Sequence, residues 1–365
     1  MGSVVPTTRS KNTHGNSSSM RKRLRTNQKS TVRVGDVAKF VGYSTATVSR
    51  ALNGQPGVSA EVREKVRKAG KKLGYLPNSS ARALRMNRTQ TIGAVIPTLN
   101  HAIYARMVEG IQKRLSVEGY GLLHTTSGYD LETECHQAMM LIERGVQGLV
   151  LVGHTHHDDL YDLLDRNQIP FINTYVYAEE AKHACVGFDN FRAAHDVADF
   201  VLQLGHRQIA MIAGISIDND RAGDRIQGVR ARLKESGIDW PSTNVAEAAY
   251  TIDAGRSAMK KLLNGAEGGF TAVICGSDIL AFGALVACQE AGKSVPEDVS
   301  IVGFDNLEFS AYLSPPLTTV EVPAANMGHV AAEYLLRRLG GESDLLREDL
   351  ETKLIVRQTT APRKA

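Results

Sequence analysis

The sequence predicts an α/β protein with a small helical head followed by a larger, doubly wound αβ body. Three observations predict this fold class: helical spacing of apolar residues before residue 76, buried-strand runs after residue 89, and a change of charge between the two regions. A chain of 365 residues is too long for one ordinary core. Its 42% hydrophobic and 22% charged residues are typical of globular proteins and exclude collagen-like or wholly disordered chains.

The overall charge of +4 hides an uneven distribution. Residues 1–88 hold nineteen Lys or Arg against three acids, a net charge of +16. The remaining residues hold 24 bases and 36 acids, a net charge of −12. The split predicts a module that binds a polyanion, joined to a body that does not. Nucleic acid and an anionic membrane surface both satisfy the charge alone.

Several classes are disfavoured by what the sequence does not contain. No window holds eighteen consecutive apolar residues, which argues against a membrane-spanning protein. The first twenty residues contain no apolar run of signal-peptide length, so we expect a cytoplasmic protein. The four cysteines form no C-x-x-C pair, which fits a reducing compartment and argues against a cysteine zinc site. No cofactor is predicted.

Residues 1–30 are rich in Ser, Thr, Asn and Gly, carry clustered Arg and Lys, and contain almost nothing apolar. They predict a disordered basic arm. The alternative is a leader with no role beyond loose attraction to phosphate.

Residues 31–76 predict three short helices. Apolar residues recur at helical spacing, first at Val34, Val37, Ala38 and Val41, then at Val48, Ala51 and Leu52, and finally at Val62, Val66, Ala69 and Leu73. Gly42 ends the first helix, and Ser44 and Ser59 are suitable N-caps for the other two. A core this small can do little except present one helix to a partner.

The layout of these helices is that of a helix-turn-helix, whose second helix can enter the major groove of DNA. Thr45, Ala46 and Arg50 share one face, and Arg50 can make a bidentate contact to guanine. Short polar side chains suit phosphate oxygens, and here they are Ser44, Thr47, Ser49 and Asn53. The alternatives are a helical hairpin that merely packs and a membrane-surface helix, which the lack of Trp in the head disfavours.

Residues 77–88 predict a hinge helix, because Pro77 is followed by only one to two turns of helix-forming sequence. So short a helix is marginal alone in water and should fold mainly when a partner pins it. The alternative is a plain linker.

Residues 89–361 alternate continuous apolar runs with amphipathic helical stretches. The predicted strands are residues 91–97, 148–152, 209–214, 272–275 and 299–304, and the predicted helices are 105–118, 132–144, 191–204, 221–236, 254–263 and 280–291. Such alternation predicts parallel sheets with helices on both faces. Some 270 residues exceed one ordinary sheet of this kind, so we expect two lobes that face one cleft.

Polar residues follow several of these runs, where ligands bind in open αβ sheets. Ser277, Asp305 and Asp189 lie at such positions, Tyr250 lies in a connection, and Arg221 and Arg225 are one turn apart on a helix. Either arginine could instead be an ordinary surface residue. The run 154–159 allows a metal site, although a polar strand end is the simpler interpretation. Common nucleotide-binding, esterase and metalloprotease motifs are absent, so no enzyme is predicted.

Residues 33–84 resemble the headpiece and hinge of the lac repressor family of bacterial transcription regulators. The matching motifs are Asp36-Val37-Ala38, Thr47-Val48-Ser49-Arg50-Ala51-Leu52-Asn53 and Gly74-Tyr75-Leu76-Pro77-Asn78. The resemblance implies that Thr45, Ala46 and Arg50 read bases. It also implies that two hinges pair in the minor groove, where Leu84 wedges a base step and small Ala81 lies one turn earlier. The family usually has Ser or Thr where Arg33 stands.

The resemblance continues through the body, to an effector domain with the fold of periplasmic sugar-binding proteins. It is carried by residues 186–190, 204–210, 303–306 and 313–320. It implies that Arg225 binds effector oxygens, Asp305 accepts from ligand hydroxyls and Tyr250 stacks. We predict Arg221, Ser277, Asp189 and Tyr104 as further effector-site residues. The implied N-lobe is residues 89–190 and 322–350, and the C-lobe is 191–321 and 351–361. Ser277 stands where the family commonly has Asn.

Residues 151–156 and 186–194 are most similar to gluconate-operon repressors within the family. The resemblance therefore implies a homodimer or tetramer that binds palindromic operator DNA under control of a sugar or sugar acid. A corepressor such as a nucleobase, with the opposite sign of control, stays open. A transport-type binding protein or an enzyme with a basic leader is the rival from another class.

Overall fold

The computed structural model describes residues 32–76, 89–265 and 269–363. The chain divides into two compact units, Met1–Arg82 and Ala83–Ala365, which we treat separately as the head and the body. The predicted basic arm and the predicted hinge helix lie outside the described residues.

The head contains the three predicted helices, α1 (Val34–Val41), α2 (Thr45–Leu52) and α3 (Ala60–Leu73). Ser44 and Ser59 cap α2 and α3 as expected, since their hydroxyls accept hydrogen bonds from the N–H groups of Thr47 and Val62. Arg33 provides no side-chain cap for α1. Instead, the Asp36 carboxylate accepts from the Arg33 N–H at 2.8 Å, which fixes the start of α1 without a Ser or Thr.

A single apolar cluster holds these helices together. Val37 from α1, Val48 from α2 and Val66 from α3 are completely buried. Gly42 ends α1 with φ 76°, a left-handed conformation that glycine adopts without a steric penalty. The sharp turn after it lets α2 leave α1 at once, so that one face of α2 packs inward and the other meets solvent.

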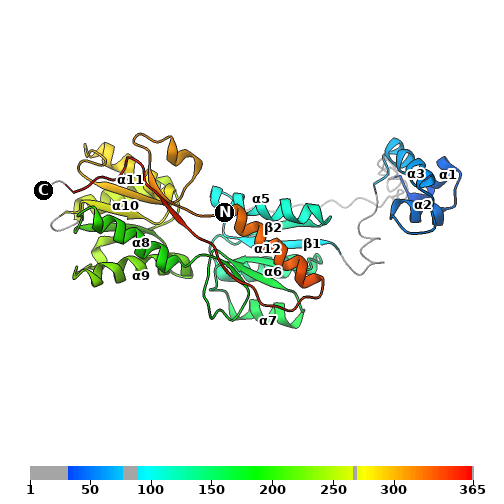
Figure 1. The fold of residues 1–365 in the computed structure, drawn as a ribbon, viewed down its shortest axis with the longest axis horizontal. Helices are drawn as coiled ribbons and strands as arrows, with labels where there is room; N and C mark the ends of the chain where they lie inside the picture. The colour runs from blue at the N-terminus through cyan, green and yellow to red at the C-terminus, as the bar shows by residue number, and fades with distance from the viewer. Residues whose placement is uncertain (1–31, 77–88, 266–268, 364–365) are drawn as a thin grey trace, which may run out of the picture. The chain divides into compact units, whose positions relative to one another are not determined.

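The body consists of two six-stranded sheets (Figure 1). The first lobe is built on β1 (Thr91–Ile96), β2 (Gly121–Thr126), β3 (Leu149–Val152), β4 (Phe171–Thr174), β5 (Cys185–Gly187) and β11 (Arg347–Asp349), in the order β11-β5-β4-β3-β1-β2. The second is built on β6 (Ile209–Gly214), β7 (Val245–Ala248), β8 (Ala272–Cys275), β9 (Ser300–Asp305), β10 (Thr318–Glu321) and β12 (Lys353–Ile355), in the order β12-β10-β9-β8-β6-β7. Neighbouring strands are parallel except β10 and β12.

Helices cover both faces of each sheet. They are α5 (Ala102–Val117), α6 (Leu131–Glu143), α7 (Asp158–Arg166), α8 (Asn190–Gln203), α9 (Asp220–Glu235), α10 (Ile252–Gly265), α11 (Asp278–Glu290) and α12 (Ala324–Leu339), with short 3-10 turns η1 (Ser242–Asn244) and η2 (Glu308–Ala311). The pairs α5 and α12, α8 and α9, and α10 and α11 pack against each other. The predicted strands and helices of the body are therefore confirmed, and so is the two-lobed αβ fold.

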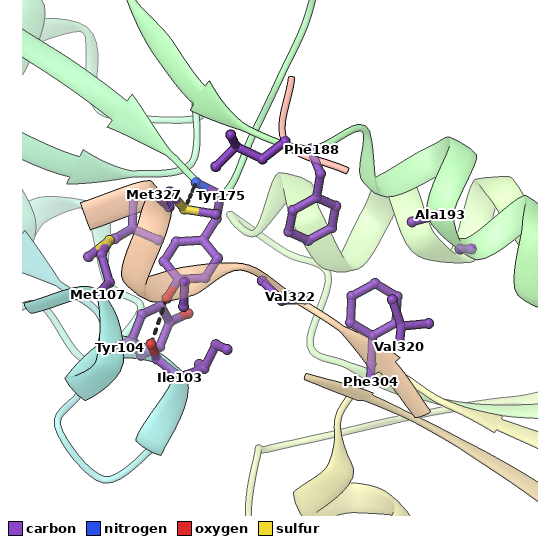
Figure 2. Close-up of a cluster of buried hydrophobic side chains, with 14 of the residues drawn as sticks. Ile103, Tyr104, Met107, Tyr175, Phe188, Ala193, Phe304, Val320, Val322 and Met327 are labelled. Carbon is purple, nitrogen blue, oxygen red and sulfur yellow. Dashed lines mark hydrogen bonds between the residues drawn. The ribbon is translucent and has the colours of Figure 1, made fainter. Parts of the chain in front are cut away.

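The chain passes between the two lobes three times, after β5, after β10 and between β11 and β12. An apolar cluster joins the lobes at these crossings (Figure 2). Phe188, just after β5, and Phe304, on β9, have ring centroids 5.9 Å apart. Val320 and Val322 lie beside them on the second crossing. Because this apolar cluster is continuous, the crossing segments are packed together where the two lobes meet.

Among the described residues, no helix is both long enough and apolar enough to cross a membrane.

Candidate functional site

The two lobes enclose a small cavity, with a free volume of about 40 Å³, beside the carboxyl ends of several parallel strands. Ligands bind at this edge of open αβ sheets. The lining residues are His101, Ile103, Tyr104, Tyr129, Tyr175, Phe188, Asn190, Asn219, Arg221, Arg225, Tyr250, Gly276, Ser277, Ile279, Asp305 and Leu307. Six of the seven residues predicted for the effector site are thus brought together around one space, and Asp189 is the exception.

The wall from the first lobe is aromatic. Tyr104 and Tyr175 meet edge to face with ring centroids 5.3 Å apart, and Tyr129 lies 5.7 Å from Tyr250 of the second lobe. Burial raises the pKa of Tyr104 and of Tyr175, so their hydroxyls stay neutral at physiological pH. This wall offers ring faces for stacking and uncharged hydroxyls for hydrogen bonds.

A directional chain of hydrogen bonds runs along this wall. Burial lowers the pKa of His101, although the Tyr250 carbonyl opposes the shift, so the ring is neutral. Its Nε2 must donate to that carbonyl at 2.7 Å, which leaves Nδ1 to accept from the Tyr129 hydroxyl at 3.3 Å. The Tyr129 oxygen can then accept from Tyr104, also at 3.3 Å. The chain connects the two lobes across the cavity mouth.

Arg225 is the main charge on the wall from the second lobe. Its Nη1 donates to Asn190 at 3.0 Å, its Nη2 donates to the Tyr250 hydroxyl at 3.2 Å, and its guanidinium lies 4.7 Å above the Phe304 ring. Its buried Nε has no partner, and within the described chain it forms no ion pair. A buried guanidinium held only by neutral groups still attracts an anionic or strongly polar oxygen.

Asp305 ends β9 with φ 110°, a backbone conformation that is strained for any residue except glycine. Burial, and then the nearby Asp278, raises the pKa of Asp305 well above its ordinary value. No hydrogen bond links its carboxyl group to any other described side chain or backbone group. The group is therefore half-buried, held in a strained position and open to a ligand.

Asp278 is buried in the same wall but is occupied. Its carboxylate accepts from the Leu307 N–H at 2.7 Å, the Ser310 hydroxyl at 2.5 Å and the Thr319 hydroxyl. Burial raises the pKa of Asp278 to about 6, against the opposing effect of these hydrogen bonds. Asp278 therefore fastens the segment after β9 to β10. The hydroxyl of neighbouring Ser277, which lines the cavity, caps α11 by accepting from Leu280 at 3.2 Å.

Arg221 also lines the cavity, but its guanidinium is engaged. Its Nη1 forms an ion pair with Asp220 at 2.6 Å and donates to the carbonyl of Val152 in the first lobe at 3.2 Å. Its predicted role toward a ligand therefore competes with a contact that joins the lobes. On the same stretch, the Oδ1 of Asn219 is buried, lines the cavity and has no partner.

The prediction for Asp189 needs correction. Its carboxylate caps α8 by accepting from the Arg192 N–H at 2.9 Å, and the next residue, Asn190, lines the cavity in its place. Sequence reasoning also missed His101, Tyr129 and Asn219. They lie in the loops that follow β1, β2 and β6. Their position after the carboxyl end of a strand is the only sequence signal that could have identified them.

The run 154–159 forms the loop after β3 and the first residues of α7, and its histidines have protein partners. The Nδ1 of His156 contacts Glu134 at 2.6 Å and its Nε2 contacts the Gly153 carbonyl at 3.1 Å, while His157 caps α7. His154 contacts Asp220. In the described part of the chain, no three His, Cys, Asp or Glu side chains are grouped as metal ligands.

In the head, Thr45, Ala46 and Arg50 are exposed on α2, opposite the buried Val48 and Ala51. The other four predicted DNA-contact residues lie on α2 or at its caps. The hydroxyls of Ser44 and Thr47 are 2.9 Å apart, and the Asn53 side-chain amide donates to the Ser49 carbonyl at 2.7 Å. Ala81 and Leu84, which were predicted to act in the hinge, lie outside the described residues.

Comparison with known families gives two matches. Residues 34–78 match the model of bacterial regulatory proteins of the lacI family, and residues 198–360 match a periplasmic binding protein-like domain. These matches fall on the helical head and on the body, respectively.

Individual relatives match nearly the full chain. The transcriptional regulator CelR of Thermobifida fusca is 34% identical over 88% of this chain and 96% of its own. The transcriptional repressor CytR of Escherichia coli K12 is 32% identical over 86% of this chain and 92% of its own. The lac repressor dimer bound to operator and an anti-inducer has a TM-score of 0.81 at 27% identity, and covers 91% of this chain and 99% of that structure. The protein therefore belongs to the lacI family of bacterial transcription regulators, which bind DNA.

Proposed function

We propose that this protein is a repressor that binds palindromic operator DNA as a homodimer, under control of a sugar or sugar acid held between its lobes. It acts in the cytoplasm, without a cofactor and without enzymatic activity. The observation that carries the effector proposal is that Arg225 and Asp305 line the same cavity, and that among residues 32–76, 89–265 and 269–363 the first forms no ion pair and the carboxyl group of the second no hydrogen bond.

The DNA-reading surface is the exposed face of α2. Thr45, Ala46 and Arg50 are the proposed base readers, because they project from the helix on the side away from the core of the head. Ser44, Thr47, Ser49 and Asn53 are proposed to contact phosphate. Arg50→Ala should cost about 1–3 kcal/mol and relax specificity at one base pair in each half-site.

The side chains that line the cavity suit a polyhydroxylated effector for three reasons. Tyr129 and Tyr250 offer faces for a sugar ring, Asn219 and Asp305 offer acceptors, and Arg225 offers a donor without a partner. One similar structure, at 32% identity and a TM-score of 0.67 over 90% of this chain and 99% of its own, is a CelR–cellobiose complex, so a sugar occupies that relative. These points support a sugar or a sugar derivative here.

A sugar acid such as gluconate is the more specific proposal. A ligand carboxylate would gain charge-assisted hydrogen bonds from Arg225. Asp305 would repel such a ligand if it were ionised, but its raised pKa favours the neutral acid, which can also donate to the ligand. A purine corepressor is the second candidate, because the rings of Tyr129 and Tyr250 could stack on a flat base. The relatives at 30–31% identity include the transcriptional repressor PurR of Klebsiella pneumoniae.

Exposed apolar residues on both lobes support the homodimer. Leu123 is 40% exposed on β2, the outermost strand of its sheet, and Met139 is exposed on α6. On the second lobe, Tyr312 is 82% exposed, and Phe282 and Leu285 line an open apolar groove. An exposed sheet edge and an apolar groove are features that a second subunit would cover. We favour a dimer over a tetramer.

Control would pass from the cavity to the head through the lobes. An effector that prefers one lobe arrangement shifts the population toward it and thereby changes the geometry of the dimer. In the proposed mechanism this separates the two hinges, residues 77–88, and releases the operator. A corepressor would order them instead.

Two measurements test this proposal. Calorimetry with gluconate, ribose and adenine identifies the ligand class, and heat from ribose or adenine alone would refute the sugar-acid version. Band shift on palindromes from the DNA around the gene, at two salt concentrations, tests the DNA reader. A sequence-specific reader loses affinity at the higher salt but keeps its preference. Arg50→Ala and Leu84→Ala variants that bound and bent DNA like the parent would contradict the docking model.

A further inference from the structure

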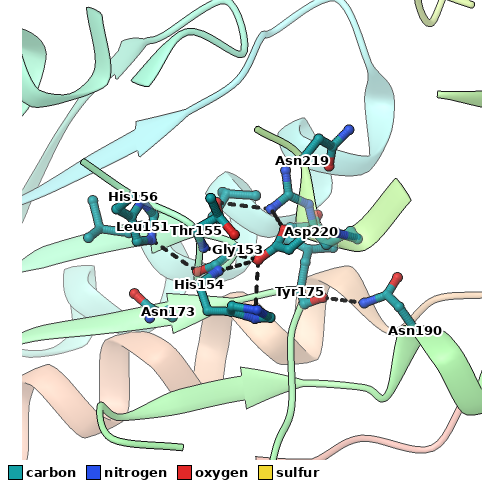
Figure 3. A network of polar contacts seen from close by, with 12 residues as sticks. Leu151, Gly153, His154, Thr155, His156, Asn173, Tyr175, Asn190, Asn219 and Asp220 are labelled. Atoms are coloured by element: carbon teal, nitrogen blue, oxygen red, sulfur yellow. Dashed lines mark hydrogen bonds and ion pairs between the residues drawn. The ribbon is translucent and has the colours of Figure 1, made fainter. Parts of the chain in front are cut away.

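A group of polar contacts beside the cavity joins the two lobes (Figure 3). Asp220, the first residue of α9 in the second lobe, reaches the loop after β3 in the first lobe. Its Oδ2 accepts from the N–H of His154 and, at 3.2 Å, from the N–H of Thr155. The His154 ring Nδ1 lies 3.1 Å from the same oxygen. One carboxylate thus binds two successive backbone donors of the opposite lobe.

Arg221 extends this contact to Val152, the last residue of β3. Asp220 Oδ1 pairs with Arg221, and Arg221 donates to the Val152 carbonyl at 3.2 Å. The Asp220 side chain is 4% exposed and the Arg221 side chain 9% exposed, so both charges are shielded from water. Burial tends to raise the pKa of Asp220, but Arg221 and the His154 N–H outweigh it and hold the pKa below its ordinary value. The carboxylate is therefore ionised, and its hydrogen bonds are charge-assisted.

Gly153 leaves room for the contact. A Cβ on this residue would lie 1.9 Å from the Arg221 Nη1 and 2.9 Å from the Asp220 Oδ1. Gly153 also has φ 93°, which a residue with a side chain rarely adopts. The loop therefore approaches Asp220 and Arg221 as closely as backbone alone allows.

Hydrogen bonds within the first lobe hold this loop in place. His156 is completely buried, and its Nε2 must donate to the Gly153 carbonyl at 3.1 Å, because a carbonyl can only accept. Its Nδ1 contacts Glu134 on α6 at 2.6 Å, and the Tyr161 hydroxyl donates to the His154 carbonyl. These contacts lie within the first lobe and hold the loop in which the N–H groups of His154 and Thr155 point at Asp220.

We propose that Asp220 and the loop 152–155 form a latch that sets the equilibrium between closed and open lobes independently of any effector. The latch uses protein atoms alone, and Asp220 is not among the residues that line the cavity. An effector must then work with or against an equilibrium that the latch has already biased, which sets the effector concentration needed for a response. His101 to Tyr250, and Arg106 to the Asn306 carbonyl at 3.0 Å, also bridge the lobes, but each with a single hydrogen bond.

The test uses the full-length protein without DNA or added small molecules, so its outcome is separate from that of the proposed function. Backbone hydrogen exchange of the segment 153–156 reports the latch, and small-angle X-ray scattering reports lobe opening. In Asp220→Ala, we expect exchange at His154 and Thr155 to rise at least about tenfold and the radius of gyration to increase. Exchange in residues 149–151 of β3, which precede the latch, should not change.

Two further variants make the test specific. Gly153→Ala should open the lobes through the clash of its Cβ with Arg221, even though it removes no polar group. If Asp220→Ala does not fold, Gly153→Ala alone tests whether the latch holds the lobes closed. Asp253→Ala is the matched control, because Asp253 is an exposed acid in the first turn of another helix of the same lobe, α10. Parent-like exchange and scattering in a folded Asp220→Ala or Gly153→Ala protein would overturn the latch.

Discussion

The two walls of the cavity differ in chemistry. The first lobe contributes neutral rings, of which Tyr104, Tyr129 and His101 are linked by hydrogen bonds. The second lobe contributes the charged or titratable groups, chiefly Arg225 and Asp305. The first wall can hold many flat or polyhydroxylated molecules by stacking. The second wall discriminates among them, because a buried charge without a partner penalises any ligand that leaves it unpaired.

The largest effect should come from the charge on the second wall. Arg225→Ala removes a guanidinium that can make charge-assisted hydrogen bonds, so we expect the affinity for the bound probe to fall roughly 1000-fold, about 4 kcal/mol. Calorimetry with gluconate, ribose and adenine measures this fall. Arg225→Lys should recover only part of the affinity, because an ammonium cannot reproduce the planar fork. Parent-like binding by Arg225→Ala would show that the second wall discriminates among ligands no more strongly than the first.

The next effect concerns stability, and it separates the two acids of the second wall. The pKa of Asp278 is raised by burial to about 6, above the 3.8 of an ordinary carboxyl group. The folded state then binds a proton more tightly than the unfolded state, so Asp278 lowers stability as pH rises from about 4 to 6. A shift of two units corresponds to about 3 kcal/mol at most. Thermal unfolding between pH 4 and pH 7 should show a smaller loss of stability with rising pH in Asp278→Asn than in the parent, and the part that remains in the variant includes the contribution of Asp305.

A smaller effect should follow from Asp305, and its pattern sharpens the comparison. Asp305→Ala removes a group that faces the ligand, so we expect about a 30-fold loss of affinity, roughly 2 kcal/mol. If the acid is neutral in the complex, Asp305→Asn should bind within about threefold of the parent, because the amide also donates and accepts. Calorimetry with the same probes distinguishes the two variants. Equal losses in both would mean that the ionised carboxylate is required.

The smallest effect should come from the first wall. Tyr129→Phe keeps the ring face but removes the hydroxyl that bonds His101, so we expect about a threefold loss of affinity. Tyr129→Ala removes the face as well and should lose about tenfold. If Tyr129→Phe lost more than Asp305→Ala, selectivity would reside in the aromatic wall instead.

The sequence was sufficient to predict the elements whose patterns are strong. The head helices have regular apolar spacing and serine caps, and the central strands are continuous apolar runs, so both were predicted correctly. Strand β2 was missed because it lies at a sheet edge and its residues GLLHTT are largely exposed, which removes the apolar run. Helix α12 was also missed, although Met327 and Leu335 on its inner face are fully buried.

The site was predicted less completely, for a physical reason. Strand ends can be located from apolar runs, and this predicted Asp305 and Ser277, while Arg225 was predicted near a helix start and Tyr250 in a connection; the structure brings all four to one cavity. Which polar atom caps a helix and which faces the ligand depends on local backbone geometry that spacing does not encode. Asp189 and Asn190 are adjacent, yet one caps α8 and the other holds Arg225. The engagement of Arg221 with Val152 needed the second lobe to be in place.

Because the chain crosses between the lobes three times, neither lobe is a continuous stretch of sequence. Recombination at a single breakpoint in the body could not transplant an intact lobe from a relative, since each sheet takes strands from separated segments. New ligand preferences in this architecture must therefore arise largely by point substitutions on the facing walls, while the head, a separate unit at one end of the chain, can be exchanged whole.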